Sequence, residues 1–239
     1  MLYLIGGAAR AGKTLIAQRM FRERLIPYFC VDYFVSAMER GAPELGIVGE
    51  SPNKERALKL WPRIEPMLRN IVEEEPAYTV EGDALLPKGV ASLCEAYAGQ
   101  VRACFIGYTT TTPERKLEEI RRFGGGVNDW IQHYPDQYIL DLCAEMIEFS
   151  QFVREECNLY RLPYFDVSDD FLDVVEKAYA MLCRPQGEIN SGMDSPPTPS
   201  CWNRHHKHSA TFRFPPVPVP VGALVAVPPA NRLSLVPGS

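Results

Sequence analysis

The sequence lacks the segments that mark membrane and secreted proteins. No run of 18 apolar residues occurs among its 239 residues, so no transmembrane helix is predicted. No basic stretch precedes the first apolar residues, so we expect no signal peptide. The seven cysteines are odd in number and form no CxxC pair, which argues against a zinc site and a disulfide framework. We therefore expect a cytoplasmic protein in a reducing compartment.

Basic charge is also scarce. The formal net charge is −5, and the first 184 residues carry −7 because the remainder has four Lys or Arg against two acids. No run of Lys and Arg is long enough to neutralise a nucleic-acid backbone. We expect neither a nucleic-acid partner nor a membrane partner.

Proline is unevenly distributed along the chain. Eleven of the 21 prolines lie between residues 185 and 239, and clustered prolines are excluded from helix interiors and central strands. This composition predicts a disordered, Pro-rich C-terminal tail over 185–239. Residues 1–184 are predicted to form one folded domain, because 46% of the whole chain is hydrophobic and 23% is charged, as in ordinary globular proteins.

Short apolar strands alternate with amphipathic helices in this domain. The predicted strands are 2–5, 28–32, 78–80, 101–108 and 164–167. The predicted helices are 13–24, 53–75, 113–123, 137–157 and 171–183. We expect Pro62 and Pro66 to kink or divide the second helix, and Ser168 or Asp169 to cap the last one. The alternation predicts a three-layer, doubly wound α/β domain with a parallel sheet covered on both faces.

One motif carries specific chemistry. Residues 7–14, GAARAGKT, match the phosphate-binding pattern GxxxxGK[ST] and lie between a predicted strand and a predicted helix. We call this segment the P-loop. Its glycines permit a tight turn that directs backbone N–H groups to phosphate, and the helix N-terminus favours negative charge. Lys13 is predicted to bridge the β- and γ-phosphates and to act in catalysis, and the Thr14 hydroxyl is predicted to coordinate Mg²⁺. The predicted nucleotide contacts are Gly7, Ala8, Ala9, Arg10, Ala11, Gly12, Lys13, Thr14 and Leu15.

Acidic residues follow two other predicted strands. Asp32 ends the second strand, and the carboxyl ends of parallel strands line the ligand crevice. It is predicted to contact the substrate and to accept a proton from its hydroxyl group; the alternative is an aspartate that only caps the next turn. Glu81 and Asp83 end the third strand. We assign Glu81 to the metal and Asp83 to the substrate. The alternative is that one of the two is only a turn residue beside Gly82.

A short basic helix is predicted between Pro113 and a triple glycine. Arg115 and Arg122 are seven residues apart and so share a helix face. We predict that they act in catalysis by closing over the nucleotide and stabilising charge on the transferred phosphoryl group, with the glycines as a hinge. The alternative is an exposed helix in which Glu118 and Glu119 pair with arginines in solvent.

The segments IGGAARAGKT, VDYF and VEGDALLP, with the basic helix, carry a family resemblance. Over residues 1–183 the chain resembles small-molecule kinases of the nucleoside-monophosphate-kinase-like branch of P-loop proteins, in particular proteins described as 2-phosphoglycerate-kinase-like or as uncharacterised AAA-type ATPases. The resemblance implies a P-loop NTPase fold with five parallel strands in the order 2-3-1-4-5, ATP with Mg²⁺, a lid, and Asp32 facing the phosphoryl acceptor. The chain departs from the pattern at Arg10 and Ala11, where many such kinases have a third glycine.

Together these features predict an ATP-dependent, Mg²⁺-dependent phosphotransferase that acts on a hydroxyl or phosphate group of a small metabolite. The chain has neither the apolar strand ending in Asp-Glu of motor ATPases nor the Asn-Lys-x-Asp signature of guanine binding. The alternative is an ATP-binding switch with little turnover, whose Pro-rich tail docks a protein partner.

Overall fold

The computed structural model describes residues 1–49, 51–123 and 130–185. Residues 186–239 of the predicted tail, and the triple glycine predicted as a hinge, lie outside the described residues. The domain boundary at residue 184 stays a prediction.

A five-stranded parallel sheet has the predicted order β2-β3-β1-β4-β5. Its strands are β1 (Leu2–Gly7), β2 (Tyr28–Cys30), β3 (Tyr78–Glu81), β4 (Val101–Gly107) and β5 (Tyr164–Asp166). The central strand β1 pairs with β3 on one side and with β4 on the other. Leu2, Leu4 and Ile5 are fully buried, as expected of a strand covered on both faces.

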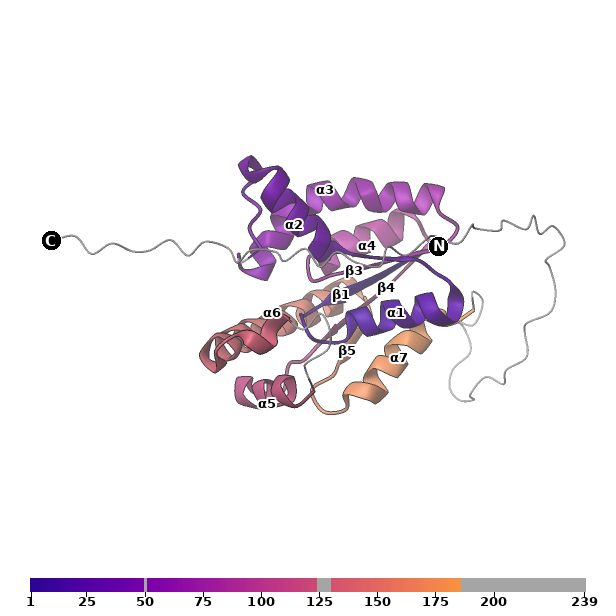
Figure 1. Cartoon of the computed structure of the whole chain (residues 1–239). Helices are drawn as coiled ribbons and strands as arrows, with labels where there is room; N and C mark the ends of the chain where they lie inside the picture. The colour runs from indigo at the N-terminus through magenta and orange to yellow at the C-terminus, as the bar shows by residue number, and fades with distance from the viewer. Residues whose placement is uncertain (50, 124–129, 186–239) are drawn as a thin grey trace, which may run out of the picture. The chain divides into compact units, whose positions relative to one another are not determined.

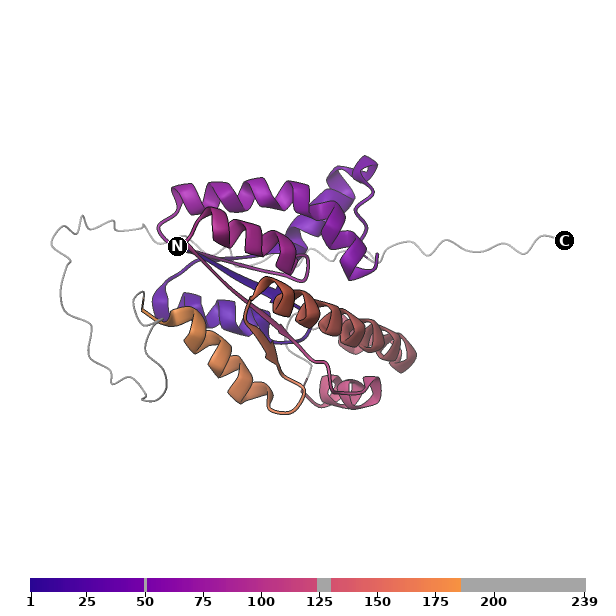
Figure 2. The ribbon, with the colours of Figure 1, turned by 180° about the vertical axis from the view of Figure 1, so that it is seen from behind.

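Helices cover both faces of the sheet, which confirms the three-layer, doubly wound α/β fold (Figures 1 and 2). The α-helices are α1 (Lys13–Arg24), α2 (Val31–Gly41), α3 (Asn53–Glu74), α4 (Pro87–Ala96), α5 (Pro113–Phe123), α6 (Asp136–Tyr160) and α7 (Phe171–Cys183). Two short 3₁₀ turns are η1 (Pro43–Leu45) and η2 (Trp130–His133). Helices α1 and α7 lie side by side on one face, and α3, α4 and α6 lie on the other. None of the helices within the described ranges is long and apolar enough to cross a membrane.

The second strand is shorter than predicted. It ends at Cys30, and α2 begins at Val31, so Asp32 lies in the first turn of a helix and not at the end of a strand. Val31 and Val35 are buried one turn apart, which anchors this helix. An acid in the first turn also interacts favourably with the positive end of the helix dipole. The predicted strand therefore extended two residues too far.

Helix α3 is continuous from Asn53 to Glu74, so its two prolines do not divide it, while the kink that was predicted as the alternative stays a prediction. Pro62 and Pro66 are four residues apart on the exposed face, where water can solvate the carbonyls that lack an N–H partner. The opposite face buries Leu60, Ile64, Leu68 and Val72, one turn apart. Burial of this apolar stripe outweighs the missing hydrogen bonds.

Two other details differ from the sequence-based expectation. Asp170, and not Ser168 or Asp169, caps α7, because its carboxylate accepts a hydrogen bond from the N–H of Asp173 at 3.1 Å. Helix α4 was not predicted, since its sequence PKGVASLCEA begins with proline and contains a glycine. Proline suits the first helical position, where no N–H partner is lost.

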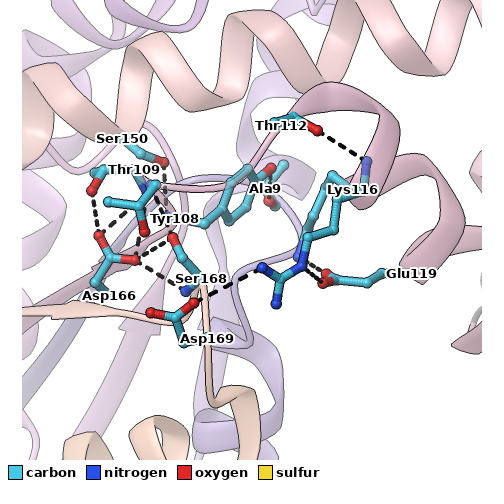
Figure 3. Close-up of polar contacts among 12 residues, drawn as sticks. Ala9, Tyr108, Thr109, Thr112, Lys116, Glu119, Ser150, Asp166, Ser168 and Asp169 are labelled. Atoms are coloured by element: carbon cyan, nitrogen blue, oxygen red, sulfur yellow. Dashed lines mark hydrogen bonds and ion pairs between the residues drawn. The ribbon is translucent and has the colours of Figure 1, made fainter.

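A polar cluster joins the carboxyl ends of β4 and β5. Asp166 accepts hydrogen bonds from the N–H and hydroxyl groups of both Thr109 and Ser168, and Ser168 in turn accepts from the N–H of Thr110 (Figure 3). Arg154 donates to the Thr109 hydroxyl at 2.8 Å. Burial alone would raise the pKa of Asp166, but the hydrogen bonds from Ser168 and Thr109 outweigh it and hold that pKa below its ordinary value. The ionised carboxylate therefore stabilises the segment that leads into α5.

Replacing Asp166 with Asn should destabilise the fold by about 1–3 kcal/mol at pH 7, because an amide cannot accept all four hydrogen bonds. Urea unfolding measures the change. The difference from the parent protein should persist above about pH 4 and shrink as the pH falls through the lowered pKa, where the parent carboxylate is itself protonated.

Asp169→Asn is the matched control, because the side chain of Asp169 is 88% exposed. It should change the free energy of unfolding by less than about 0.5 kcal/mol. Equal effects of the two substitutions would contradict the role of Asp166.

Candidate active site

The P-loop connects β1 to α1 through a backbone that few residues can adopt. Gly7, Arg10 and Gly12 have φ angles of 117°, 63° and 103°, in the left-handed region that favours glycine. Gly7 also lies against β4, where a Cβ atom would be only 1.9 Å from the carbonyl oxygen of Ile106. The N–H of Ala8 donates to the same oxygen at 3.0 Å. Glycine is therefore required at position 7 by the backbone angle and by the contact with β4. Arg10 adopts the left-handed conformation although it is not a glycine.

The two polar residues that complete the motif both donate hydrogen bonds within the site. Lys13 is buried, and its Nζ donates to the carbonyl of Ala8 at 2.7 Å. The Thr14 hydroxyl donates to Oε1 of Glu81 at 2.9 Å. The first turn of α1 contains no acidic residue, so the positive end of its dipole is not offset by a carboxylate there. The loop thus presents an ammonium group and a helix N-terminus to an anion.

Three acids from two neighbouring segments gather beside this loop. In the sheet register, Glu81 of β3 is paired with Ile5 of β1 and with Cys30 of β2, so the residues after these strands meet at one edge. Glu81 is 1% exposed and Asp83 is 9% exposed. Asp32 from α2 interacts electrostatically with both, and also with Lys13. The structure therefore brings together at this edge five of the residues predicted for metal, substrate and catalysis: Lys13, Thr14, Asp32, Glu81 and Asp83.

Asp32 has a perturbed acidity. Desolvation by the surrounding protein and the nearby carboxylates of Asp83 and Glu81 raise its pKa to about 6, while Lys13 and Arg56 act in the opposite direction. Its side chain is nevertheless exposed to solvent. A carboxylate that is accessible and has a pKa near neutrality is suited to accept a proton.

Arg56 was missed by the sequence reasoning. It lies in α3, and its Nη2 contacts Oδ2 of Asp83 at 2.9 Å and the side-chain oxygen of Asn53. Its Nη1 donates to the backbone carbonyls of Gly49 and Ser51. A signal was present in the sequence, because Arg56 stands four residues before Leu60 on the buried stripe of α3. A cation at an apolar position of a helix indicates a buried partner.

One oxygen of this ion pair remains without a donor. Among the described residues, Oδ1 of Asp83 is buried and has no hydrogen-bond partner. Buried carboxylate oxygens are nearly always hydrogen-bonded, so Oδ1 is an acceptor available to a bound hydroxyl group or water. The prediction that Asp83 contacts the substrate is consistent with this atom.

The basic helix α5 exposes both of the arginines that are predicted to act in catalysis. Arg115 is 51% exposed and contacts Glu119 at 3.5 Å and Asp169 at 3.9 Å (Figure 3). Arg122 is exposed and lies over the ring of Phe123. Lys116, by contrast, is only 5% exposed and pairs with Glu119 at 3.1 Å. The alternative of glutamate paired with arginine in solvent thus describes Arg115, and the inward-facing cation of this helix is Lys116.

A magnesium ion fits the oxygen atoms at this edge. No group of three or more His, Cys, Asp or Glu side chains in the described part of the chain could hold a metal ion by itself. Mg²⁺ commonly uses only one or two protein ligands together with substrate phosphates and water. The Thr14 hydroxyl and the Glu81 carboxylate, 2.9 Å apart, are ligands of this kind.

Comparisons with known proteins give remote likenesses only. No protein-family model and no curated protein matches the chain. A shikimate kinase from Bacteroides thetaiotaomicron is 15% identical, with a TM-score of 0.46, covering 76% of this chain and 98% of that one. A gluconokinase from Sinorhizobium meliloti is 16% identical, with a TM-score of 0.43, covering 75% and 90%. A deoxyadenosine kinase from M. mycoides is 13% identical, with a TM-score of 0.40, covering 76% and 98%. Matches at this level leave the chemistry to be derived from the residues of this chain.

The raised pKa of Asp32 can be tested directly in the ligand-free protein. Its carboxyl carbon should titrate near pH 6 in an NMR experiment. In an Asp83→Asn variant the pKa of Asp32 should fall, because a neighbouring negative charge has been removed. An unchanged pKa in that variant would mean that Asp83 does not act on Asp32.

Proposed function

We propose that this chain is an ATP-dependent, Mg²⁺-dependent kinase that phosphorylates a small metabolite. The observation that carries the proposal is the P-loop itself: buried Lys13 lies at the N-terminus of α1, and the hydroxyl of Thr14 faces the carboxylate of Glu81 at 2.9 Å. Cations and N–H groups directed at one point are suited to bind a triphosphate. The adjacent Asp32 adds a proton acceptor, which a protein that only binds ATP does not need.

The proposed reaction is an in-line transfer of the γ-phosphoryl group. The acceptor oxygen forms a bond to the γ-phosphorus while the bond from that phosphorus to the β–γ bridging oxygen breaks, and ADP leaves with the electron pair. The acceptor proton passes to the carboxylate of Asp32. Lys13 would exchange its hydrogen bond with the Ala8 carbonyl for the β- and γ-phosphates. Thr14 and Glu81 would hold Mg²⁺, which neutralises phosphate charge when it is bound.

The charges at the site favour a hydroxyl group as the acceptor over a phosphate. A hydroxyl has a proton for Asp32 to remove, and a second hydroxyl of the same metabolite could donate a hydrogen bond to Oδ1 of Asp83. A phosphate acceptor would need a cation, whereas the two terminal nitrogens of Arg56 already contact four oxygen atoms and only its Nε has no partner among the described residues. Arg115 and Arg122 remain proposed contributors from α5, which would have to move toward the phosphates.

The proposal is tested by incubating the full-length protein with γ-labelled ATP, Mg²⁺ and a library of hydroxyl-bearing and phosphate-bearing metabolites. We expect label to pass to at least one acceptor with a hydroxyl group. Slow hydrolysis with every acceptor would reject a kinase and favour the nucleotide switch.

Lys13→Met keeps most of the side-chain volume and removes the ammonium group. It should lower kcat by about 10²–10³-fold, since it removes a charge aimed at the transferred group. Circular dichroism checks that the fold is intact. Lys59→Met is the control, because Lys59 is exposed and pairs only with its helical neighbour Glu55 and a backbone carbonyl. Full activity in Lys13→Met would exclude the proposed role of the P-loop.

Asp32→Asn tests the proton acceptor. It should reduce kcat by about 10²–10⁴-fold, the usual contribution of a general base. In the parent protein kcat/KM for ATP, which reports on the free enzyme, should rise with pH through about 6 as Asp32 loses its proton. This rise should be absent in the variant. Unchanged turnover would transfer the role to another acid.

A further inference from the structure

Tyr108 connects the P-loop to the end of β4. It is 1% exposed, and its hydroxyl donates to the carbonyl of Ala9, in the middle of the P-loop, at 3.0 Å (Figure 3). Its own N–H donates to the hydroxyl of Ser150 on α6 at 3.2 Å. Burial raises the pKa of Tyr108 far above its ordinary value. The phenol therefore remains a hydrogen-bond donor throughout the working pH range.

The carbonyl that Tyr108 holds is one that must face away from phosphate. A phosphate-binding loop directs its N–H groups inward, and a carbonyl that turned inward would repel the anion. Ala9 immediately precedes Arg10, whose φ of 63° costs a residue with a side chain about 1–2 kcal/mol. The segment between Gly7 and Gly12 thus adopts a strained turn, and the Tyr108 hydroxyl is a hydrogen-bond partner that holds this turn from outside.

The other contact of Tyr108 is with the basic helix. Nζ of Lys116 lies 4.4 Å from the centre of the Tyr108 ring, within the range of a cation–π interaction. Lys116 is buried there and is held by Glu119 on the next turn of α5. One aromatic residue therefore contacts the P-loop with its hydroxyl and helix α5 with its ring.

Helix α5 has a small apolar cluster of its own, separate from the main core. Its members are Ile120, Ile131, Ile139 and Cys143, with Leu117 and Leu142 packed against them. A helix that packs mainly on such a satellite cluster can shift without opening the main core. A shift of α5 would then change the contact of Lys116 with the Tyr108 ring, and through Tyr108 the hydrogen bond to the P-loop.

We propose that Tyr108 is a positioning residue that holds the P-loop in its phosphate-binding shape and couples that shape to helix α5 through Lys116. The inference rests on the proposed use of the P-loop for a triphosphate. Tyr108 lies outside the sequence motif, and we expect it to determine affinity for the phosphates and not for the rest of the nucleotide.

The test compares Tyr108→Phe with the parent protein by calorimetric titration of ATP with Mg²⁺. The substitution keeps the ring and removes one hydrogen bond, so the Kd for ATP should rise by about 3- to 10-fold. The Kd for adenosine, which carries no phosphate, should stay within about 2-fold of the parent value. An equal loss of affinity for both ligands would mean a general structural defect and would overturn the inference.

Tyr164→Phe is the matched control. Tyr164 lies on the adjacent strand β5 and is partly buried, whereas Tyr108 is fully buried, and the Tyr164 hydroxyl makes no hydrogen bond to the described residues of the P-loop. This variant should bind ATP as the parent protein does. If it weakens ATP binding as much as Tyr108→Phe, the contact with Ala9 is not the cause.

Lys116→Met tests the coupling to α5 while leaving Tyr108 in place. The double variant with Tyr108→Phe should weaken ATP binding by less than the product of the two single effects, because both residues act on the same loop. Strictly multiplicative effects would overturn the coupling. Failure of the parent protein itself to bind ATP would instead reject the proposed function, so the two failures are distinguishable.

Discussion

The site depends on the close approach of the P-loop backbone to strand β4. Gly7 lies where a Cβ atom would be 1.9 Å from the Ile106 carbonyl, and the N–H of Ala8 donates to that carbonyl at 3.0 Å. Two residues beyond Ile106, the Tyr108 hydroxyl holds the carbonyl of Ala9. Two hydrogen bonds therefore hold the start of the loop against β4 and the residue that follows it: one is donated by the N–H of Ala8, and the other is accepted by the carbonyl of Ala9. These contacts stabilise the turn that a phosphate-binding loop requires.

Positive and negative groups lie together at this edge of the sheet. Lys13 and the N-terminus of α1 supply positive charge, whereas Asp32, Glu81 and Asp83 supply negative charge beside them. Arg56 partly offsets these acids and leaves one oxygen of Asp83 without a donor. Desolvation and the neighbouring carboxylates of Asp83 and Glu81 raise the pKa of Asp32 to about 6. The packing of this edge therefore provides a base that is suited to work near neutral pH.

Local patterns predicted most of the framework, because each depends on short-range physics. The bounds of α1, α5 and α7 follow from the spacing of their apolar residues and from Pro and capping signals. The P-loop was recognised because its glycines and Lys13 are contiguous in the chain. Arg56 and Tyr108 were missed because their partners, Asp83 and Ala9, are 27 and 99 residues away in sequence. The helix at α3 was predicted, but whether its two prolines divide it was decided by burial of its apolar stripe.

The sequence by itself determined the five strands, five of the helices, the parallel α/β class and the phosphate-binding motif, because hydrophobic periodicity and glycine spacing are properties of the local chain. Only the tertiary structure decided which side chains face the motif. Packing of α5 buried Lys116 against Tyr108 and left Arg115 in solvent, and the start of α2 at Val31 put Asp32 on a helix beside Asp83 and Glu81. These outcomes depend on which elements meet in space. Which elements pack together is set by the burial of whole apolar surfaces, and no short segment of sequence encodes such a surface.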